Sequence, residues 1–136
     1  MPVTSPHDLL RAGQAIQQRL EGAQRLLEGA RNSGRPADWE HLAPRQRVGA
    51  HELPEWYLSC FRTIVGSYGK DSAALKEWNE FLRAARDARP DLDLNDTLEV
   101  VRAGAEDLAR ALEVLQRISS HPPAHSRGRP TITVGR

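Results

Sequence analysis

Apolar residues recur every three or four positions in four segments of the chain, which is the spacing of an amphipathic α-helix. The first helix is predicted to run from Pro6, with Ser5 as its N-cap, to about Arg31, where the sequence NSGRP ends it. Residues 32–53 contain two prolines and are predicted to form a connector with one short helical turn, pinned to the core by Trp39. The first helix is expected to bury a stripe that consists of Leu9, Ala12, Ile16, Leu20, Ala23, Leu27 and Ala30.

Two further helices are predicted on either side of the sequence GSYGKDS. One begins at Pro54 and is ended by Gly69, because glycine adopts the positive φ that closes a helix at little cost. Asp71 or Ser72 then caps the next helix, which ends before Pro90. Six of the seven aromatic residues of the chain, all except Trp39, lie in these two helices and are expected to form the centre of the core. The inward face of the helix from Pro54 is expected to contain Trp56, Cys60, Phe61, Ile64, Val65 and Tyr68.

The fourth predicted helix starts after Asn95 or Asp96 and reaches Ile118. Its apolar seam follows a heptad spacing, so it requires a partner helix: the first helix of the same chain, or the same helix of a second copy. The matching stripe on the first helix favours the internal pairing. We therefore predict an all-α fold, a four-helix antiparallel bundle with a proline-rich connector. The seam consists of Leu98, Val101, Ala105, Leu108, Leu112 and Leu115.

Charged residues at a spacing of four lie on the faces that this bundle would expose, and we expect them to form ion pairs within their helices. These pairs are Glu21 with Arg25, Glu106 with Arg110, and Glu113 with Arg117.

The composition changes after residue 119, which divides the chain into a helical domain, 1–119, and an extended basic tail, 120–136. The sequence TITV in this tail alternates like a β-strand and is expected to add to the edge of a partner. All 18 acidic residues precede the tail, with 16 of the 19 basic ones, so nucleic acid could be contacted only through the tail. The partner-binding candidates are Arg127, Arg129, Thr131, Ile132, Thr133 and Val134.

Apolar residues make up 39% of the chain, but none of their runs approaches the roughly 18 residues of a membrane span. The first residues lack the pattern of an export signal, and Cys60 is the only cysteine, so we expect a cytoplasmic protein without a disulfide. A thiol among aromatic residues is expected to be part of the core.

Two arginine and histidine pairs are the candidates for catalysis. Arg35 precedes His41 by six residues, and Arg45 precedes His51 by six. This spacing resembles that of HEPN ribonucleases, helical proteins in which an arginine lies four to six residues ahead of a histidine, and such a pair could orient a ribose hydroxyl and stabilise phosphate charge. Both pairs fall in the predicted connector, whereas that family has its motif at the head of a core helix.

No metal site or cofactor is predicted. The sequence DLDLND begins like a calcium-binding loop, with Asp91, Asp93 and Asn95 at alternate positions. Asp96 then occupies the position of the required glycine, and Arg102 occupies that of the required glutamate. Helix capping explains the segment better.

A tryptophan-led helix that ends at an aromatic residue and glycine, followed by an acidic residue, serine and a second helix, resembles helical segments ahead of TIR-like and other effector domains in bacterial anti-phage proteins. The resemblance covers residues 50–118, and no effector domain follows. It implies a sensing, oligomerising or docking module whose catalytic partner is another chain. The matching residues are Trp56, Tyr68, Gly69, Asp71, Ser72 and Phe81.

The function that these features favour is a non-enzymatic module for protein–protein interaction or oligomerisation, with bacterial defence as its context. A protein partner or a second copy would contact the face of the fourth helix and the tail. Two alternatives stay open: a HEPN-like ribonuclease toxin, and a structural subunit of a larger assembly such as a virion or a ribonucleoprotein complex.

Overall fold

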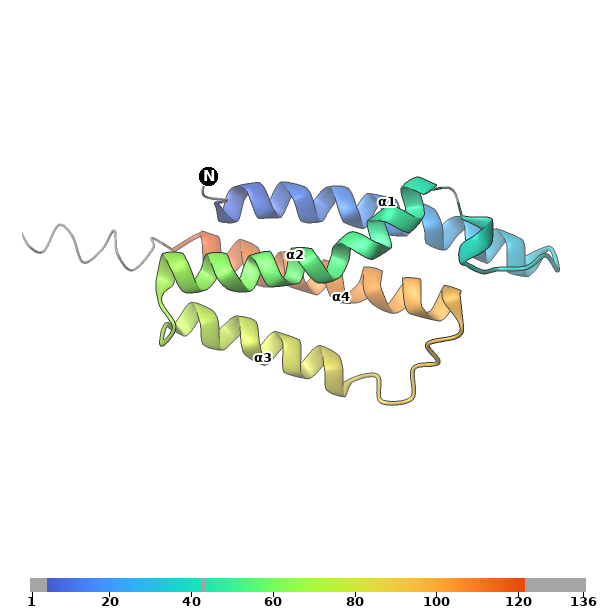
Figure 1. Ribbon diagram of the computed structural model, residues 1–136. Helices are drawn as coiled ribbons and strands as arrows, with labels where there is room; N and C mark the ends of the chain where they lie inside the picture. The colour runs from blue at the N-terminus through green and yellow to red at the C-terminus, as the bar shows by residue number, and fades with distance from the viewer. Residues whose placement is uncertain (1–4, 43, 122–136) are drawn as a thin grey trace, which may run out of the picture.

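The computed structural model describes residues 5–42 and 44–121, and the side chains of residues 41, 45, 46 and 48–51 lie outside that description. The described chain contains helices throughout and no strand, which confirms the all-α prediction for this part (Figure 1). Its elements, in order, are α1 (Pro6–Asn32), the 3₁₀ turn η1 (Trp39–His41), α2 (Pro44–Tyr68), α3 (Ala73–Asp87) and α4 (Thr97–Ser119).

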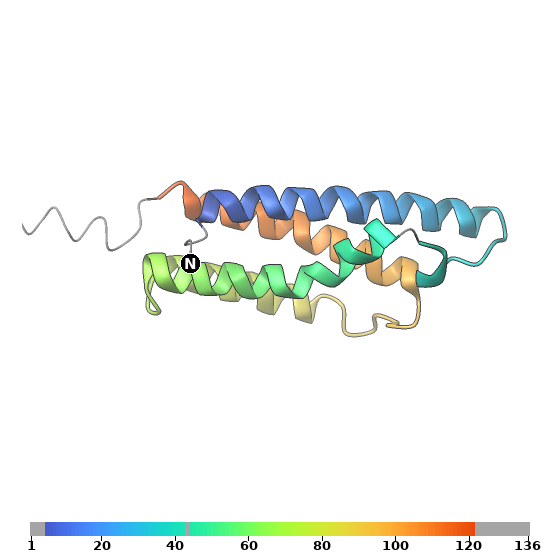
Figure 2. The ribbon, with the colours of Figure 1, turned by 45° about the horizontal axis from the view of Figure 1, so that its top comes forward.

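The helices lie side by side, and each runs in the opposite direction to the helix before it (Figures 1 and 2). α1 packs along both α4 and α2, while α3 packs against α4 and α2. The start of α1, the turn between α2 and α3, and the end of α4 lie at one end of the molecule. The two longer connections, from α1 to α2 and from α3 to α4, lie at the other end.

Side-chain caps start three of the four helices at the positions that the sequence indicates. Ser5 Oγ accepts a hydrogen bond from the Asp8 amide at 3.1 Å, and the Ser5 amide donates to the Asp8 carboxylate, which completes a capping box. The hydroxyl of Ser72 caps α3, and the carboxylate of Asp96 caps α4. Gly69, with φ of 100°, terminates α2 as expected.

The cap at Asp96 makes stability depend on pH. Its carboxylate accepts a hydrogen bond from the Glu99 amide and pairs with Arg31 of α1 at 2.8 Å, and both contacts lower its pKa from the ordinary value of 3.8. A carboxyl whose pKa is lower in the folded state contributes stability above its unfolded pKa, and the contribution is lost as the pH falls through the folded pKa.

We expect Asp96→Asn to destabilise the protein near pH 7, because asparagine still caps the helix but does not pair with Arg31. The difference from the wild type should vanish once the pH is below the folded pKa of Asp96, as measured by urea denaturation at a series of pH values. A difference that stays constant with pH would contradict this assignment.

The predicted connector is wrong over its last ten residues, because α2 begins at Pro44 and continues through Pro54. Pro44 lies at the first helical position, where proline is favoured. Pro54 has no N–H to donate to the carbonyl four residues earlier, so it tends to bend the helix rather than start it. In Figure 1 the first turns of α2 are inclined to the rest of the helix. Leu53 packs against the core and Glu52 pairs with Arg19 of α1, and these contacts favour the helical state of this segment.

The predicted turn near Trp39 is present as η1, and Trp39 packs against the core as expected.

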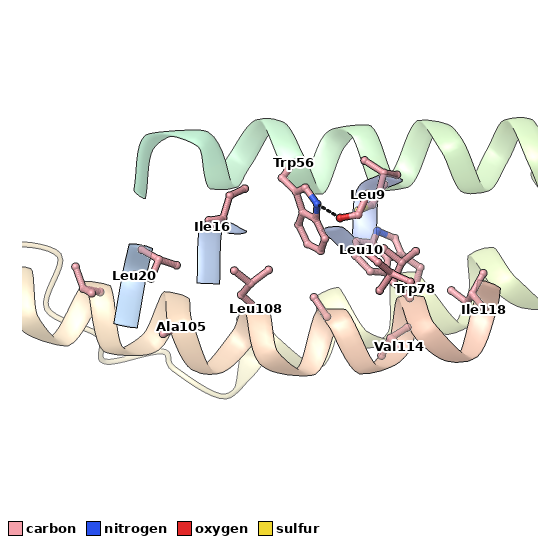
Figure 3. Packing of buried hydrophobic residues seen from close by; sticks show 14 of the residues in the cluster. Leu9, Leu10, Ile16, Leu20, Trp56, Trp78, Ala105, Leu108, Val114 and Ile118 are labelled. Carbon is pink, nitrogen blue, oxygen red and sulfur yellow. Dashed lines mark hydrogen bonds between the residues drawn. The ribbon is translucent and has the colours of Figure 1, made fainter. Parts of the chain in front are cut away.

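The apolar seam of α4 is used inside the chain. Five of its six predicted members are buried, and Leu112 is half-buried. In Figure 3 the side chains of Ala105 and Leu108 point from α4 toward Ile16 and Leu20 of α1. Four further apolar residues of α4 are buried outside the predicted seam: Ala103, Ala111, Val114 and Ile118.

Trp56 connects α2 to α1 at a point where α1 has no side chain. Its indole Nε1 donates to the Leu9 carbonyl at 2.8 Å (Figure 3). A Cβ placed on Gly13 would lie 2.6 Å from the indole ring and 2.7 Å from Leu112 of α4. Glycine at position 13 therefore permits the close approach of all three helices, and it replaces the exposed Ala12 in the predicted inward stripe.

Among the described residues, several ion pairs join segments that are far apart in the sequence. Arg31 pairs with Asp96 and Arg102 with Glu28, both between α1 and α4. Two charges that were expected to pair within α4 have partners elsewhere: Arg117 pairs with Glu77 of α3, and Glu106 with Arg89. These side chains are partly exposed, so each pair stabilises the fold by only about 0–1 kcal/mol.

Candidate interaction surface on α2 and α3

The two candidate catalytic pairs lie in different structural surroundings. Arg35 is exposed in the connection after α1, and His41 is the last residue of η1. Arg45 and His51 both belong to the first two turns of α2. This placement contradicts the prediction that the second pair is part of an irregular connector. The backbone of α2 therefore presents Arg45 and His51 at the head of a core helix.

Of the two surfaces predicted to bind a partner, the tail and a face of α4, the structure describes only the second. The tail residues Arg127, Arg129, Thr131, Ile132, Thr133 and Val134 lie outside the described residues. α1 covers the seam of α4, as the favoured internal pairing predicts, so a partner that contacts α4 would use a face of this helix outside the seam.

Most residues of the defence-associated pattern have structural roles. The Tyr68 hydroxyl lies 2.9 Å from the carbonyl oxygens of Ile118 and His121, which links the end of α2 to the end of α4. The Ser72 hydroxyl donates to the Gly69 carbonyl at 2.8 Å and closes the turn between α2 and α3. Phe81 packs against the core, whereas Asp71 is exposed.

Cys60 and the acidic segment before α4 have structural positions too. Cys60 is fully buried, and burial raises the pKa of its thiol to about 12, so the reactive thiolate is suppressed at neutral pH. Asp93 accepts a hydrogen bond from the Asn95 amide, and Asp96 caps α4. Residues 5–42 and 44–121 contain no group of three or more metal-ligating side chains.

A cleft opens where α3 stops short of its neighbours. α3 has 15 residues, whereas α2 has 25 and α4 has 23, so α3 leaves part of both helices uncovered. The cleft has a volume of about 380 Å³, a size at the low end of that of ligand pockets. Its apolar walls come from Leu53 and Tyr57 of α2, Phe81 and Leu82 of α3, and Val100 of α4.

Arg89 of the cleft is held by two carboxylates of α4. Arg89 donates to Glu106 at 2.9 Å and to Asp107 at 3.0 Å, and these contacts raise the pKa of its guanidinium. Burial, and then the Asp107 carboxylate, raise the pKa of Tyr57, so its hydroxyl stays protonated. The Tyr57 hydroxyl and Arg89 Nε are buried and have no hydrogen-bond partner among the described residues. The cleft thus offers an apolar surface and no activated base or nucleophile.

An exposed apolar stripe lies on α2 beside its inward face. Leu58 is 48% exposed and Phe61 is 39% exposed, which corrects the prediction that Phe61 points inward. With exposed Pro54 and half-buried Val65, they follow steps of four, three and four residues, so they share one face of the helix. We call Pro54, Leu58, Phe61 and Val65 the α2 stripe. The sequence contains the signal for it, a second apolar row next to the row of Trp56, Cys60, Ile64 and Tyr68.

Other exposed large apolar side chains are isolated. Leu26 of α1 is 52% exposed, and the residues three and four positions away from it are glycine or alanine. Leu94 is 76% exposed in the connection between α3 and α4. Single exposed leucines are ordinary on protein surfaces, whereas a row of four apolar residues along one helix is the type of patch that other proteins contact.

None of the helices in the described part of the chain is long and apolar enough to cross a lipid bilayer.

The α2 stripe and the cleft lie on the same stretch of α2, because Glu55 neighbours the stripe and Leu53 lines the cleft. Comparisons with models of protein families, with curated proteins and with solved structures find no match to this chain.

Proposed function

We propose that this protein is a non-enzymatic interaction module, a four-helix antiparallel bundle that docks a protein through the outer surface of α2 and α3. The observation that carries this proposal is the α2 stripe, in which Leu58 and Phe61 are exposed side by side. Burial of a leucine or phenylalanine side chain stabilises a complex by about 1.5–3 kcal/mol. A partner that covers the stripe therefore forms a complex that is stabilised by this burial, which the isolated chain lacks.

The chemistry of the described residues supports an interaction role. Arg89 and Asp107 of the cleft are paired with each other, and the Cys60 thiol is buried and protonated at neutral pH. The likeness to helical segments of bacterial anti-phage proteins supports an accessory role in defence, with the catalytic activity on another chain.

Leu58→Asp is expected to abolish partner binding, because a carboxylate would be desolvated at the centre of the interface. Leu26→Asp on α1 is the matched control, since Leu26 is equally exposed and lies off the stripe. The measurement is recovery of proteins with tagged wild type and each variant from cells that naturally make this chain. A partner that is recovered equally well with both variants would contradict the assignment of the surface.

Ribonuclease activity is the second candidate, and the placement of Arg45 and His51 favours it. Both belong to the first turns of α2 rather than to a connector, and HEPN ribonucleases have their arginine and histidine at the head of a core helix. Purified wild-type protein would then cleave RNA, and His51→Ala would abolish cleavage without unfolding the chain. His41→Ala is the control, because His41 lies outside α2. Equal cleavage by the two variants would reject this assignment.

A further inference from the structure

The charges next to the α2 stripe have a specific order. Glu55 and Arg62 are both exposed and lie seven residues apart, so they occupy the same side of α2, along one border of the stripe. Neither forms an ion pair with a described residue. The border therefore carries an acid near one end of the stripe and a base near the other, and both are available to a partner.

The order of these two charges is self-complementary in an antiparallel pair of α2 helices, where the acid of one helix lies near the base of the other. In an antiparallel pair of α2 helices, Leu58 of one copy lies level with Phe61 of the other, and Pro54 lies level with Val65. Glu55 of one copy is then offset from Arg62 of the second copy by two residues, about 3 Å along the axis, which a long arginine side chain spans. Two-fold symmetry makes this contact twice.

A parallel pair would not make these contacts, since a two-fold axis along the helices places this border of the two copies on opposite flanks of the pair. Opposite charges that meet across a helix pair select its partner and orientation, so this border favours the antiparallel pair.

We propose that the partner of the α2 stripe is a second copy of this chain, bound antiparallel through Leu58 and Phe61 and oriented by the pairing of Glu55 with Arg62. This inference rests on the proposed interaction function and names its partner. The stripe covers about 12 residues of helix, roughly 18 Å, so the contact belongs to the small and reversible class of interfaces. We expect a dimer in concentration-dependent exchange with the monomer.

The test uses charge variants of the full chain and sedimentation equilibrium over a wide range of protein concentrations. Glu55→Arg places two arginines on each border, and Arg62→Glu places two glutamates there. Each variant alone should dimerise about tenfold more weakly than the wild type, because two attractive contacts become repulsive. An equimolar mixture of the two variants, and the double variant with both changes, should dimerise like the wild type, because each again pairs opposite charges.

Circular dichroism of each variant verifies that the fold is intact, which we expect because both positions are exposed. A wild-type chain that stays monomeric at every concentration would overturn the inference, as would a mixture no stronger than the single variants. If self-association fails but a different protein is recovered with Leu26→Asp and not with Leu58→Asp, the interaction surface is correct and only the identity of the partner is wrong. If both variants recover the same proteins as the wild type, the proposed function is wrong too.

Discussion

Trp78→Ala is expected to lower the free energy of unfolding by about 3–5 kcal/mol, the range for truncating a large buried aromatic side chain. Trp78 is fully buried on α3, and its ring centre lies 5.5–6.2 Å from those of Trp56, Tyr57 and Phe81. Native domains have only about 5–15 kcal/mol of stability, so this loss would remove a large part of it. Urea denaturation followed by far-ultraviolet circular dichroism measures the change.

Leu94→Ala is the control for this measurement, because Leu94 is 76% exposed and its truncation should change stability by less than about 0.5 kcal/mol. A loss below about 1 kcal/mol for Trp78→Ala would contradict its place at the centre of the core.

Substitution of Trp56 or Trp78 by phenylalanine distinguishes the contribution of the indole hydrogen bond to stability from that of packing. Trp56 Nε1 donates to the Leu9 carbonyl, whereas Trp78 Nε1 is buried without a partner among the described residues. Trp56→Phe should therefore cost about 1 kcal/mol more than Trp78→Phe, the net value of a typical hydrogen bond.

Gly13→Ala is expected to destabilise the protein by about 1–3 kcal/mol, the usual range for overpacking a core. The added methyl group would lie 2.6 Å from the indole ring of Trp56 and 2.7 Å from Leu112. Leu112 is half-buried and can turn aside, but the indole is held by its hydrogen bond to Leu9. Alanine is favoured over glycine in a helix by about 1 kcal/mol, which is too little to offset the clash.

Gly29→Ala is the matched control in the same helix. No atom of another part of the chain lies within 4 Å of a Cβ at position 29, so only the helix propensity changes. The free energy of unfolding, measured by urea denaturation, should rise by up to about 1 kcal/mol for Gly29→Ala and fall for Gly13→Ala. Two variants that change stability in the same direction would show that the contact between α1 and α2 is looser than the structure has it.

Local signals in the sequence located the helix ends well. Ser5 caps α1 and Gly69 ends α2 because their effects involve only the next few backbone groups. Where the sequence left two cap residues open, for α3 and α4, the structure selects Ser72 and Asp96. Neighbouring candidates of similar chemistry can be distinguished only by the geometry of the helix that follows.

The start of α2 was misread because Pro54 was taken as a boundary. Proline removes one backbone hydrogen bond, and this local cost argues for a helix that begins there. Contacts distant in the sequence offset the cost: Glu52 pairs with Arg19, and Leu53 packs against the core. The same error moved Arg45 and His51 out of a helix and so weakened the ribonuclease alternative.

The candidate surface was only partly accessible to sequence reasoning. The row of Pro54, Leu58, Phe61 and Val65 has helical spacing, but it lies beside an equally regular row that is buried. Periodicity identifies an apolar row without telling which of two adjacent rows faces the other helices. The cleft depends on α3 ending before its neighbours and on the path of the chain between α3 and α4.

By itself the sequence determined that the part of the chain before the tail is helical, where most of its helices begin and end, and that the seam of α4 needs a partner helix, because these properties depend on residues within one or two turns. The tertiary structure decided that α1 is that partner, that Arg117 and Glu106 pair with other elements, and that the α2 stripe stays exposed. Which of several apolar or charged neighbours a side chain meets depends on the relative positions of whole helices, and contacts between residues far apart in the sequence set those positions.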